Sequence, residues 1–155
     1  MPLTGLVTKL FLFVGLTILI TTSTVLPGQS QNSLALSRYR WQKRLLFLFA
    51  PTSSDPGLQT LRAELHQSAR EVRERDLVVF VILAEGQSYQ NGRELSSQDV
   101  QTLRQRFGIS PRATAVVLVG KDGGVKLQRP GPVALADIFA LIDSMPMRQQ
   151  EKRGQ

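Results

Sequence analysis

The hydrophobic residues of this chain gather into short uninterrupted runs, separated by stretches with a mixed pattern. Two runs, Arg44–Ala50 and residues 77–84, have the length and composition of strands buried on both faces of a sheet. A third run covers residues 114–120. The Asp-Gly turn within residues 121–124 then predicts a hairpin to a fourth strand at residues 125–128, which is polar enough to lie at a sheet edge.

Between these runs, apolar residues recur at spacings of three, four and seven, which predicts helices that each bury one face. The first helix begins at Asp55, a capping residue, with Pro56 at the first helical position. The second begins at Ser96 or Ser97 and ends at Gly108, where glycine accepts a left-handed backbone at little cost. The apolar faces consist of Leu58, Leu61, Leu65 and Val72 in the first helix, Val100, Leu103 and Phe107 in the second, and Leu135, Ile138, Phe139, Ile142 and Met145 in a third.

The elements follow one another as strand, helix, strand, helix, two-stranded hairpin and helix. This order predicts a single α/β domain over residues 38–146, with a mixed four-stranded sheet and helices on both faces. Residues 31–37 are predicted to be a polar linker, and residues 85–94 an exposed turn-rich connection. Because Pro146 is expected to end the last helix, residues 147–155 are predicted to be a basic polar tail.

The first thirty residues have the order of an export signal peptide. One positive charge precedes a compact apolar run at residues 10–20, and a polar stretch follows. Small residues at Gly28 and Ser30 fit cleavage before Gln31, with residues 22–24 as alternative sites. The other interpretation is an uncleaved N-terminal anchor, because the apolar stretch approaches the roughly 20 residues that cross a bilayer. Both predict an extracytoplasmic domain, periplasmic or secreted.

The composition of the chain excludes chemistry that depends on cysteine and favours anionic partners. The chain contains no cysteine, which excludes disulfides, thiolate metal ligands and thiol nucleophiles within it. Its net charge is +7, from 19 Lys and Arg against 12 Asp and Glu, and a basic surface favours anionic partners. Since an exported protein seldom meets nucleic acid, we expect an envelope or extracellular protein, or an anionic surface. Membrane contact is expected only through an uncleaved N-terminus or a basic segment.

The order of elements resembles the thioredoxin fold, and FGISPRATAVVLVGKDGG (residues 107–124) is similar in kind to the matching thioredoxin segment. Four stretches resemble more specifically an uncharacterised thioredoxin-like family, domain-of-unknown-function family 4174: SRYRWQKRLLFLFAP (37–51), RDLVVF (75–80), the FGI to VKL region (107–127) and MPMRQQ (145–150). The resemblance implies a thioredoxin-like β-α-β-α-β-β-α fold and an extracytoplasmic setting. It implies no known activity.

The chain differs from redox-active thioredoxins at the position of their Cys-x-x-Cys motif. The resemblance places the Cys-x-x-Cys motif near Ser53 and Pro56, neither of which can form a thiolate, so dithiol exchange is excluded. The fold's cis-proline would fall near Ala115, whereas Pro111 is predicted to be an ordinary loop proline. We therefore expect a protein that is not a thiol-disulfide oxidoreductase.

The strongest candidate for a binding surface is the segment that leads into the first strand. Basic residues alternate there with aromatic ones, a pattern suited to a polyanion or a membrane surface. An extended backbone would place Arg38 and Arg40 on one face, with Trp41 and Lys43 on the other. The alternative is a solvated lead-in with Trp41 packed on the core. The candidate residues are Arg38, Arg40, Trp41, Lys43 and Arg44, together with Ser53 and Ser54 at the first helix N-terminus.

The helix N-terminus and the remaining polar residues support two hypotheses. Asp55 is expected to cap the first helix, which leaves little room for an anion beside Ser53 and Ser54. His66, the only histidine, has no partner at helical spacing and is expected at the surface. We predict no catalytic, metal or cofactor residue and favour a non-catalytic interaction domain. The alternative is a thiol-independent enzyme in which Ser53, Asp55, Arg112 and Lys121 converge.

Overall fold

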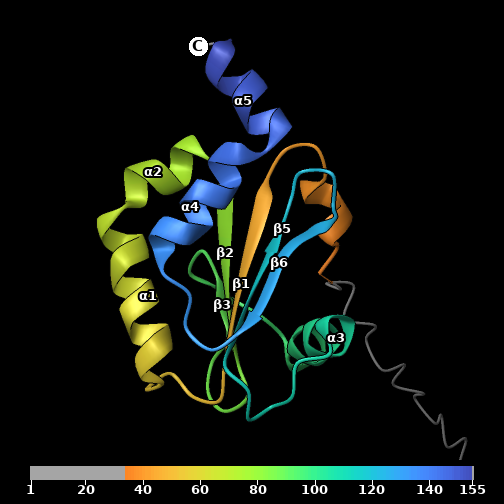
Figure 1. Ribbon diagram of the computed structural model, residues 1–155. Helices are drawn as coiled ribbons and strands as arrows, with labels where there is room; N and C mark the ends of the chain where they lie inside the picture. Colours follow the sequence, from red (N-terminus) through yellow and green to blue (C-terminus); the bar gives the residue numbers. More distant parts are fainter. Residues whose placement is uncertain (1–33, 155) are drawn as a thin grey trace, which may run out of the picture. The chain divides into compact units, whose positions relative to one another are not determined.

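The computed structural model describes residues 34–154 (Figure 1). The predicted signal peptide or anchor, and the first part of the predicted linker, lie outside these residues. None of the helices described there is both long enough and apolar enough to cross a membrane.

A six-stranded mixed sheet forms the centre of the domain, in the order β4-β3-β2-β1-β5-β6. β1 pairs in parallel with β2 on one side and antiparallel with β5 on the other. The strands are β1 (Arg44–Ala50), β2 (Leu77–Leu83), β3 (Tyr89–Gln90), β4 (Arg93–Glu94), β5 (Ala115–Val119) and β6 (Val125–Pro130). The four predicted strands are confirmed, as is the α/β class.

Two short strands were not expected. Residues 85–94, predicted to be an exposed turn-rich connection, contain β3 and β4, and β3 extends the sheet beyond β2. The turn between them is formed by Asn91 and Gly92, which both have positive φ angles, 46° and 79°. An Asn-Gly pair with this backbone is a strong hairpin signal, so the expectation of an exposed connection without strands is wrong here.

Helices cover both faces of the sheet, as predicted (Figure 1). α1 (Pro56–Gln67), α2 (Ala69–Glu74) and α4 (Leu135–Ser144) lie on one face, and α3 (Ser97–Phe107) lies on the other. Asp55 caps α1 and Ser96 caps α3, each by accepting the N–H of the residue three positions on. Gly108 ends α3 with a φ of 64°, as expected.

The alternation of β1 side chains divides the core into two layers. Leu46 and Leu48 pack with α1 and α4, whereas Leu45, Phe47 and Phe49 pack with α3. In the second layer Phe47 stacks on Phe80, with ring centroids 4.7 Å apart. Because β1 packs in both layers of the core, its position is fixed. The polar loops at its two ends are the candidate positions for a functional site.

The structure differs from prediction in three further segments. The first predicted helix is broken at Ser68, which separates α1 from α2. The predicted linker ends in a 3-10 helix, Leu36–Tyr39, with Leu34 and Leu36 packed against the core. Residues 147–155 were expected to be a polar tail, but α5 (Pro146–Arg153) occupies most of this segment. Pro146 is the first residue of that helix, a position that proline favours.

Candidate functional site

The loop after β1 is where the thioredoxin resemblance places the reactive thiols, and here it is occupied by helix capping. The Asp55 carboxylate accepts the Leu58 N–H at 2.9 Å through one oxygen and the Thr114 hydroxyl at 2.7 Å through the other. Ser53 and Ser54 are exposed, and the hollow beside Thr114 encloses only 10 Å³. That volume holds at most about one water molecule.

The enzyme hypothesis required four polar residues to converge, and they do not. Arg112 precedes β5 at the same end of the sheet as Ser53, and its side chain is exposed. Lys121 follows β5, which runs antiparallel to β1, and therefore lies at the opposite end of the sheet. Its Nζ contacts Asp76 and Glu151 there, at 2.9 and 2.6 Å. The predicted convergence is thus wrong, because the pairing of β5 separates Lys121 from the other three.

A cleft of about 660 Å³ lies beside α3 at the carboxyl end of β2, and it was not predicted. Its walls are largely apolar, and its buried polar residues include Ser88 and Arg104, which are 3% and 7% exposed. The two terminal nitrogens of Arg104 donate to the carbonyl oxygens of Ser110, Ala50 and Ile82, at 2.8, 2.9 and 3.2 Å. Burial lowers the pKa of the Arg104 guanidinium. Arg104 therefore ties together three chain segments at this end of the sheet.

The basic segment at the amino end of β1 has a different backbone from the one expected. It forms a 3-10 turn followed by a reversal at Trp41, so Arg38 and Arg40 do not alternate with Trp41 along an extended strand. Trp41 has a φ of 66°, which is rare for a bulky residue, and its N–H donates to the Lys121 carbonyl at 2.6 Å. Its side chain is 59% exposed, so the alternative in which Trp41 packs on the core is wrong. Tyr39 packs there instead, edge-on to Phe80.

The guanidinium groups of this segment lie over its aromatic rings. Arg38 is 4.9 Å from the Tyr39 ring centroid and Arg40 is 5.1 Å from that of Trp41. Arg40 also donates to the Asp122 carbonyl at 3.1 Å, which joins the segment to the β5–β6 turn. Between the segment and this turn lies a hollow of about 480 Å³, whose lining includes Arg40, Lys43, Arg106, Gly123 and Gly124. We name the exposed part of this region, Arg38 to Lys43, the basic aromatic segment.

Arg44 belongs to the interior and not to the binding surface for which it was a candidate. Its side chain is 1% exposed, and it donates to the Arg75 carbonyl and to both carboxylate oxygens of Glu151. Lys43 remains partly exposed and pairs with Asp76 at 2.7 Å. The structure therefore keeps Arg38, Arg40, Trp41 and Lys43 together at one end of the sheet. It places Ser53 and Ser54 at the other end.

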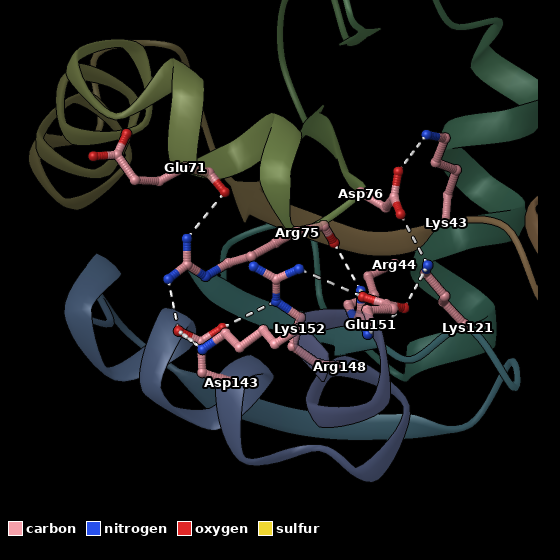
Figure 2. A network of polar contacts seen from close by, with 10 residues as sticks. All are labelled: Lys43, Arg44, Glu71, Arg75, Asp76, Lys121, Asp143, Arg148, Glu151 and Lys152. Carbon is pink, nitrogen blue, oxygen red and sulfur yellow. Dashed lines mark hydrogen bonds and ion pairs between the residues drawn. The ribbon is translucent and has the colours of Figure 1, made fainter. Parts of the chain in front are cut away.

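Arg44 is part of a charge network that the sequence did not reveal (Figure 2). Glu151 from α5 reaches Lys121, Arg44 and Arg148, and Asp143 from α4 reaches Arg75, Arg148 and Lys152. With Lys43 and Asp76, six cations meet three carboxylates, which leaves an excess of three positive charges. The members are Lys43, Arg44, Arg75, Asp76, Lys121, Asp143, Arg148, Glu151 and Lys152.

Each of the three carboxyl groups of the network has a pKa below its ordinary value. Burial alone would raise the pKa of Glu151, but hydrogen bonds from Lys121 and Arg44 outweigh it and hold the pKa below its ordinary value. The same balance lowers the pKa of Asp76, through Lys43 and Lys121, and that of Asp143, through Arg75 and Lys152. The network thus fixes α5 to the domain near neutral pH.

Within residues 34–154, no group of His, Asp and Glu side chains is placed to hold a metal ion. His66 lies exposed on α1. In the described part of the chain, the basic aromatic segment keeps Arg38, Arg40 and Trp41 exposed, whereas Arg44, Lys121 and Arg148 are buried in the charge network.

Comparison with protein families matches residues 35–151 to a domain of unknown function, DUF4174. The chain belongs to the DUF4174 family. The match includes α5 as far as Glu151. The chain is 32% identical over 132 residues to the coiled-coil domain-containing protein 80 of Danio rerio, a match that covers 75% of this chain and 15% of that protein. It is 27% identical over 136 residues to the sushi repeat-containing protein SRPX2 of Xenopus laevis, a match that covers 84% of this chain and 30% of that protein.

This DUF4174 chain thus spans less than a third of the length of either of these relatives. Among solved structures, it is similar to a reduced 2-Cys peroxiredoxin of Plasmodium vivax, with a TM-score of 0.60, 15% identity and coverage of 77% and 72% of the two chains. A thioredoxin peroxidase I of Plasmodium yoelii gives a TM-score of 0.52, 18% identity and coverage of 77% and 81%. These similarities establish a thioredoxin-like fold. The absence of cysteine separates this chain from the thiol chemistry of that fold.

Proposed function

We propose that this DUF4174 domain is a non-redox binding module that contacts an anionic partner through the basic aromatic segment. The observation that carries the proposal is Trp41, the only tryptophan of the chain, held 59% exposed by a left-handed backbone conformation. A bulky residue in that conformation is strained, and strain of this kind tends to be kept where it serves a function. Tryptophan and arginine are also the residues that contribute most to binding energy at interfaces.

The charges around Trp41 support an anionic partner. Arg38 is free of carboxylate contacts among the described residues, and Arg40 bonds only to a carbonyl oxygen there. Both guanidinium groups therefore keep most of their donors for a ligand. Arg106 and Lys43 line the adjacent hollow and extend the positive surface. This arrangement suits a partner that carries several negative charges, for which binding depends strongly on salt.

The proposal is tested by the affinity of the full chain for dextran sulfate, measured by isothermal titration calorimetry at two salt concentrations. A soluble polyanion is the right probe, because the apolar run at residues 10–20 would itself partition into vesicles. The double variant R38Q/R40Q should bind about fivefold more weakly, since each exposed charge contributes about 0.5 kcal/mol.

The matched control is R112Q/R129Q, which removes the same charge from exposed positions at the other end of β5 and β6. It should bind within about twofold of the unmodified chain. Equal weakening in both double variants would mean that net charge alone drives binding, and the proposed segment would then be wrong.

We also infer that the domain acts outside the cytoplasm. The inference rests on the signal-like order of the first thirty residues. Cell fractionation followed by N-terminal sequencing of the native protein tests it. A mature N-terminus near Gln31 in the periplasm or medium would support export with cleavage, and an intact Met1 in the membrane fraction would support the anchor. A cytoplasmic protein that keeps Met1 would contradict both.

A further inference from the structure

The cleft beside α3 has the volume of a small-molecule site and lies where such sites are common. It measures about 660 Å³, within the range of about 300–1,000 Å³ that ligand pockets occupy. Leu83, the last residue of β2, lines it and pairs with Ala50, the last residue of β1. The chain leaves β1 towards α1 on one face of the sheet and leaves β2 towards α3 on the other (Figure 1). In open α/β sheets, ligands tend to bind outside the carboxyl ends of strands at such a reversal.

The buried polar side chains of the cleft already have their partners within the protein. Ser88 Oγ accepts the Leu83 N–H at 2.8 Å and faces the Leu83 carbonyl oxygen at 3.4 Å. Both terminal nitrogens of Arg104 donate to carbonyl oxygens, and its Nε is closed off from solvent. Neither side chain therefore leaves a donor free for a ligand. The rest of the buried wall is apolar and consists mainly of the side chains of Leu83, Leu95, Val100 and Ile109.

The rim of the cleft carries side-chain amides and no excess of charge. Gln87, Gln101 and Gln105 line it and are exposed, and their amides can both donate and accept hydrogen bonds. Among residues 34–154, the charged residues of the lining are Glu94 and Arg104, whose charges cancel, although the whole chain carries +7. This balance distinguishes the cleft from the basic aromatic segment. A charged ligand would lose its water against the apolar walls without gaining a free countercharge, so an uncharged ligand is favoured.

We propose that this cleft binds a small uncharged molecule with an apolar body and an amide or hydroxyl group at its edge. The body packs against Leu83, Val100 and Ile109, where burial of apolar surface supplies the affinity. The polar group exchanges hydrogen bonds with the glutamines of the rim, which fixes its orientation. The site lies at the carboxyl end of β1 and β2, whereas the basic aromatic segment lies at the amino end of β1. The two sites are therefore independent.

Two probes of the same shape test the site: naphthalene-2-carboxamide, which is uncharged, and naphthalene-2-carboxylate. The full chain, labelled with ¹³C in its Ile, Leu and Val methyl groups, is titrated with each probe and followed by NMR. The carboxamide should shift the methyl resonances of Leu83, Val100 and Ile109 along a saturable curve, with a Kd of about 1 mM or tighter for a probe of this size. The carboxylate should bind at least about tenfold more weakly. Because each resonance is assigned to a residue, any probe bound to the apolar run at residues 10–20 is detected separately.

A pair of substitutions locates the bound probe. Ala84 is exposed, lines the cleft and lies outside the helices and strands, so Ala84→Phe adds a ring that occupies part of the cleft. It should weaken binding of the carboxamide by at least about tenfold. The matched control is Ala136→Phe, which adds the same ring at an exposed position on α4 and should change the affinity by less than about twofold. The methyl spectrum of each variant shows at the same time that it is folded.

Three outcomes would overturn the proposal. Methyl resonances of the cleft that do not shift, or that shift without saturating, would mean that it holds no small molecule and would leave the apolar side chains of a partner protein as its occupant. Equal or tighter binding of the carboxylate would contradict the uncharged class. Equal weakening by Ala84→Phe and Ala136→Phe would place the probe elsewhere. The R38Q/R40Q variant should bind the carboxamide normally, so this site and the proposed function can fail separately.

Discussion

Substitution of Glu151 by glutamine should loosen α5 from the domain. The Glu151 carboxylate lies 2.6 Å from Lys121 Nζ, 3.2 Å from an Arg44 terminal nitrogen and 3.6 Å from one of Arg148. All three cations are at least nine-tenths buried, at 8%, 1% and 5% exposure. Glutamine has the same shape but no charge, and it turns an NH₂ group towards cations that themselves only donate hydrogen bonds.

The size of the effect follows from this geometry. Breaking a fully buried ion pair costs about 3–5 kcal/mol, and losing a hydrogen bond to a charged group costs about 1.5–3 kcal/mol. Glu151 is 25% exposed, so water screens the pair, and Lys121 keeps its contact with Asp76. We expect Glu151→Gln to lower the free energy of unfolding by about 2 kcal/mol, which lowers Tm by about 8 °C for a domain of this size.

Urea unfolding and hydrogen exchange together provide the assay. Amides of α5 should exchange faster in Glu151→Gln, while those of β1 and β2 should change only through the overall loss of stability. The control is Glu74→Gln, which removes a carboxylate from the exposed Arg70–Glu74 pair on α2 and should leave the urea midpoint unchanged. If Glu151→Gln destabilises no more than Glu74→Gln, the network does not hold α5 in place and our account of it is wrong.

Two further predictions concern the same network and the cleft beside α3. The folded pKa values of Asp76, Asp143 and Glu151 lie below their unfolded values, so these carboxylates stabilise the fold above about pH 5. This stabilisation is lost as the pH falls through about 4 and below. The urea midpoint should therefore fall between pH 7 and pH 3, and a midpoint that does not change with pH would contradict the network. Arg104→Met should lower the free energy of unfolding by about 2–3 kcal/mol, because it removes the donors to three carbonyl oxygens. Faster exchange in residues 51–55 and 109–114 should accompany that loss, and unchanged exchange there would show that Arg104 does not tie these loops.

Much of the fold follows from the sequence because its signals are local. The uninterrupted apolar run of β1, the Asp55-Pro56 cap and Gly108 each act within a few residues, and each appears as predicted. The same reasoning fails where a local sequence is compatible with two different structures. Pro146 both stops α4 and starts α5, and the Asn91-Gly92 pair can belong to a loop or to a hairpin.

The candidate site was harder to predict, because its side chains are brought together by β-sheet pairing. Nothing local to Arg44 or Lys121 indicates burial, and only the antiparallel pairing of β1 with β5 places them beside Glu151. In the sequence, Arg104 looks like an ordinary helical arginine, and only the fold places the ends of β1 and β2 beside it. The basic aromatic segment was recognised from its composition. The exposure of Trp41 depends on a positive φ angle, which the sequence does not indicate for a tryptophan.

The proposed binding role is tested most directly by the fluorescence of Trp41. Because the chain has one tryptophan, its emission reports on the basic aromatic segment without a label or a substitution. Titration of the full chain with dextran sulfate at low salt should shift the emission to shorter wavelength and protect it from acrylamide quenching, and added salt should reverse both effects. Binding that calorimetry detects but that leaves emission and quenching unchanged would place the contact elsewhere and contradict the proposed function.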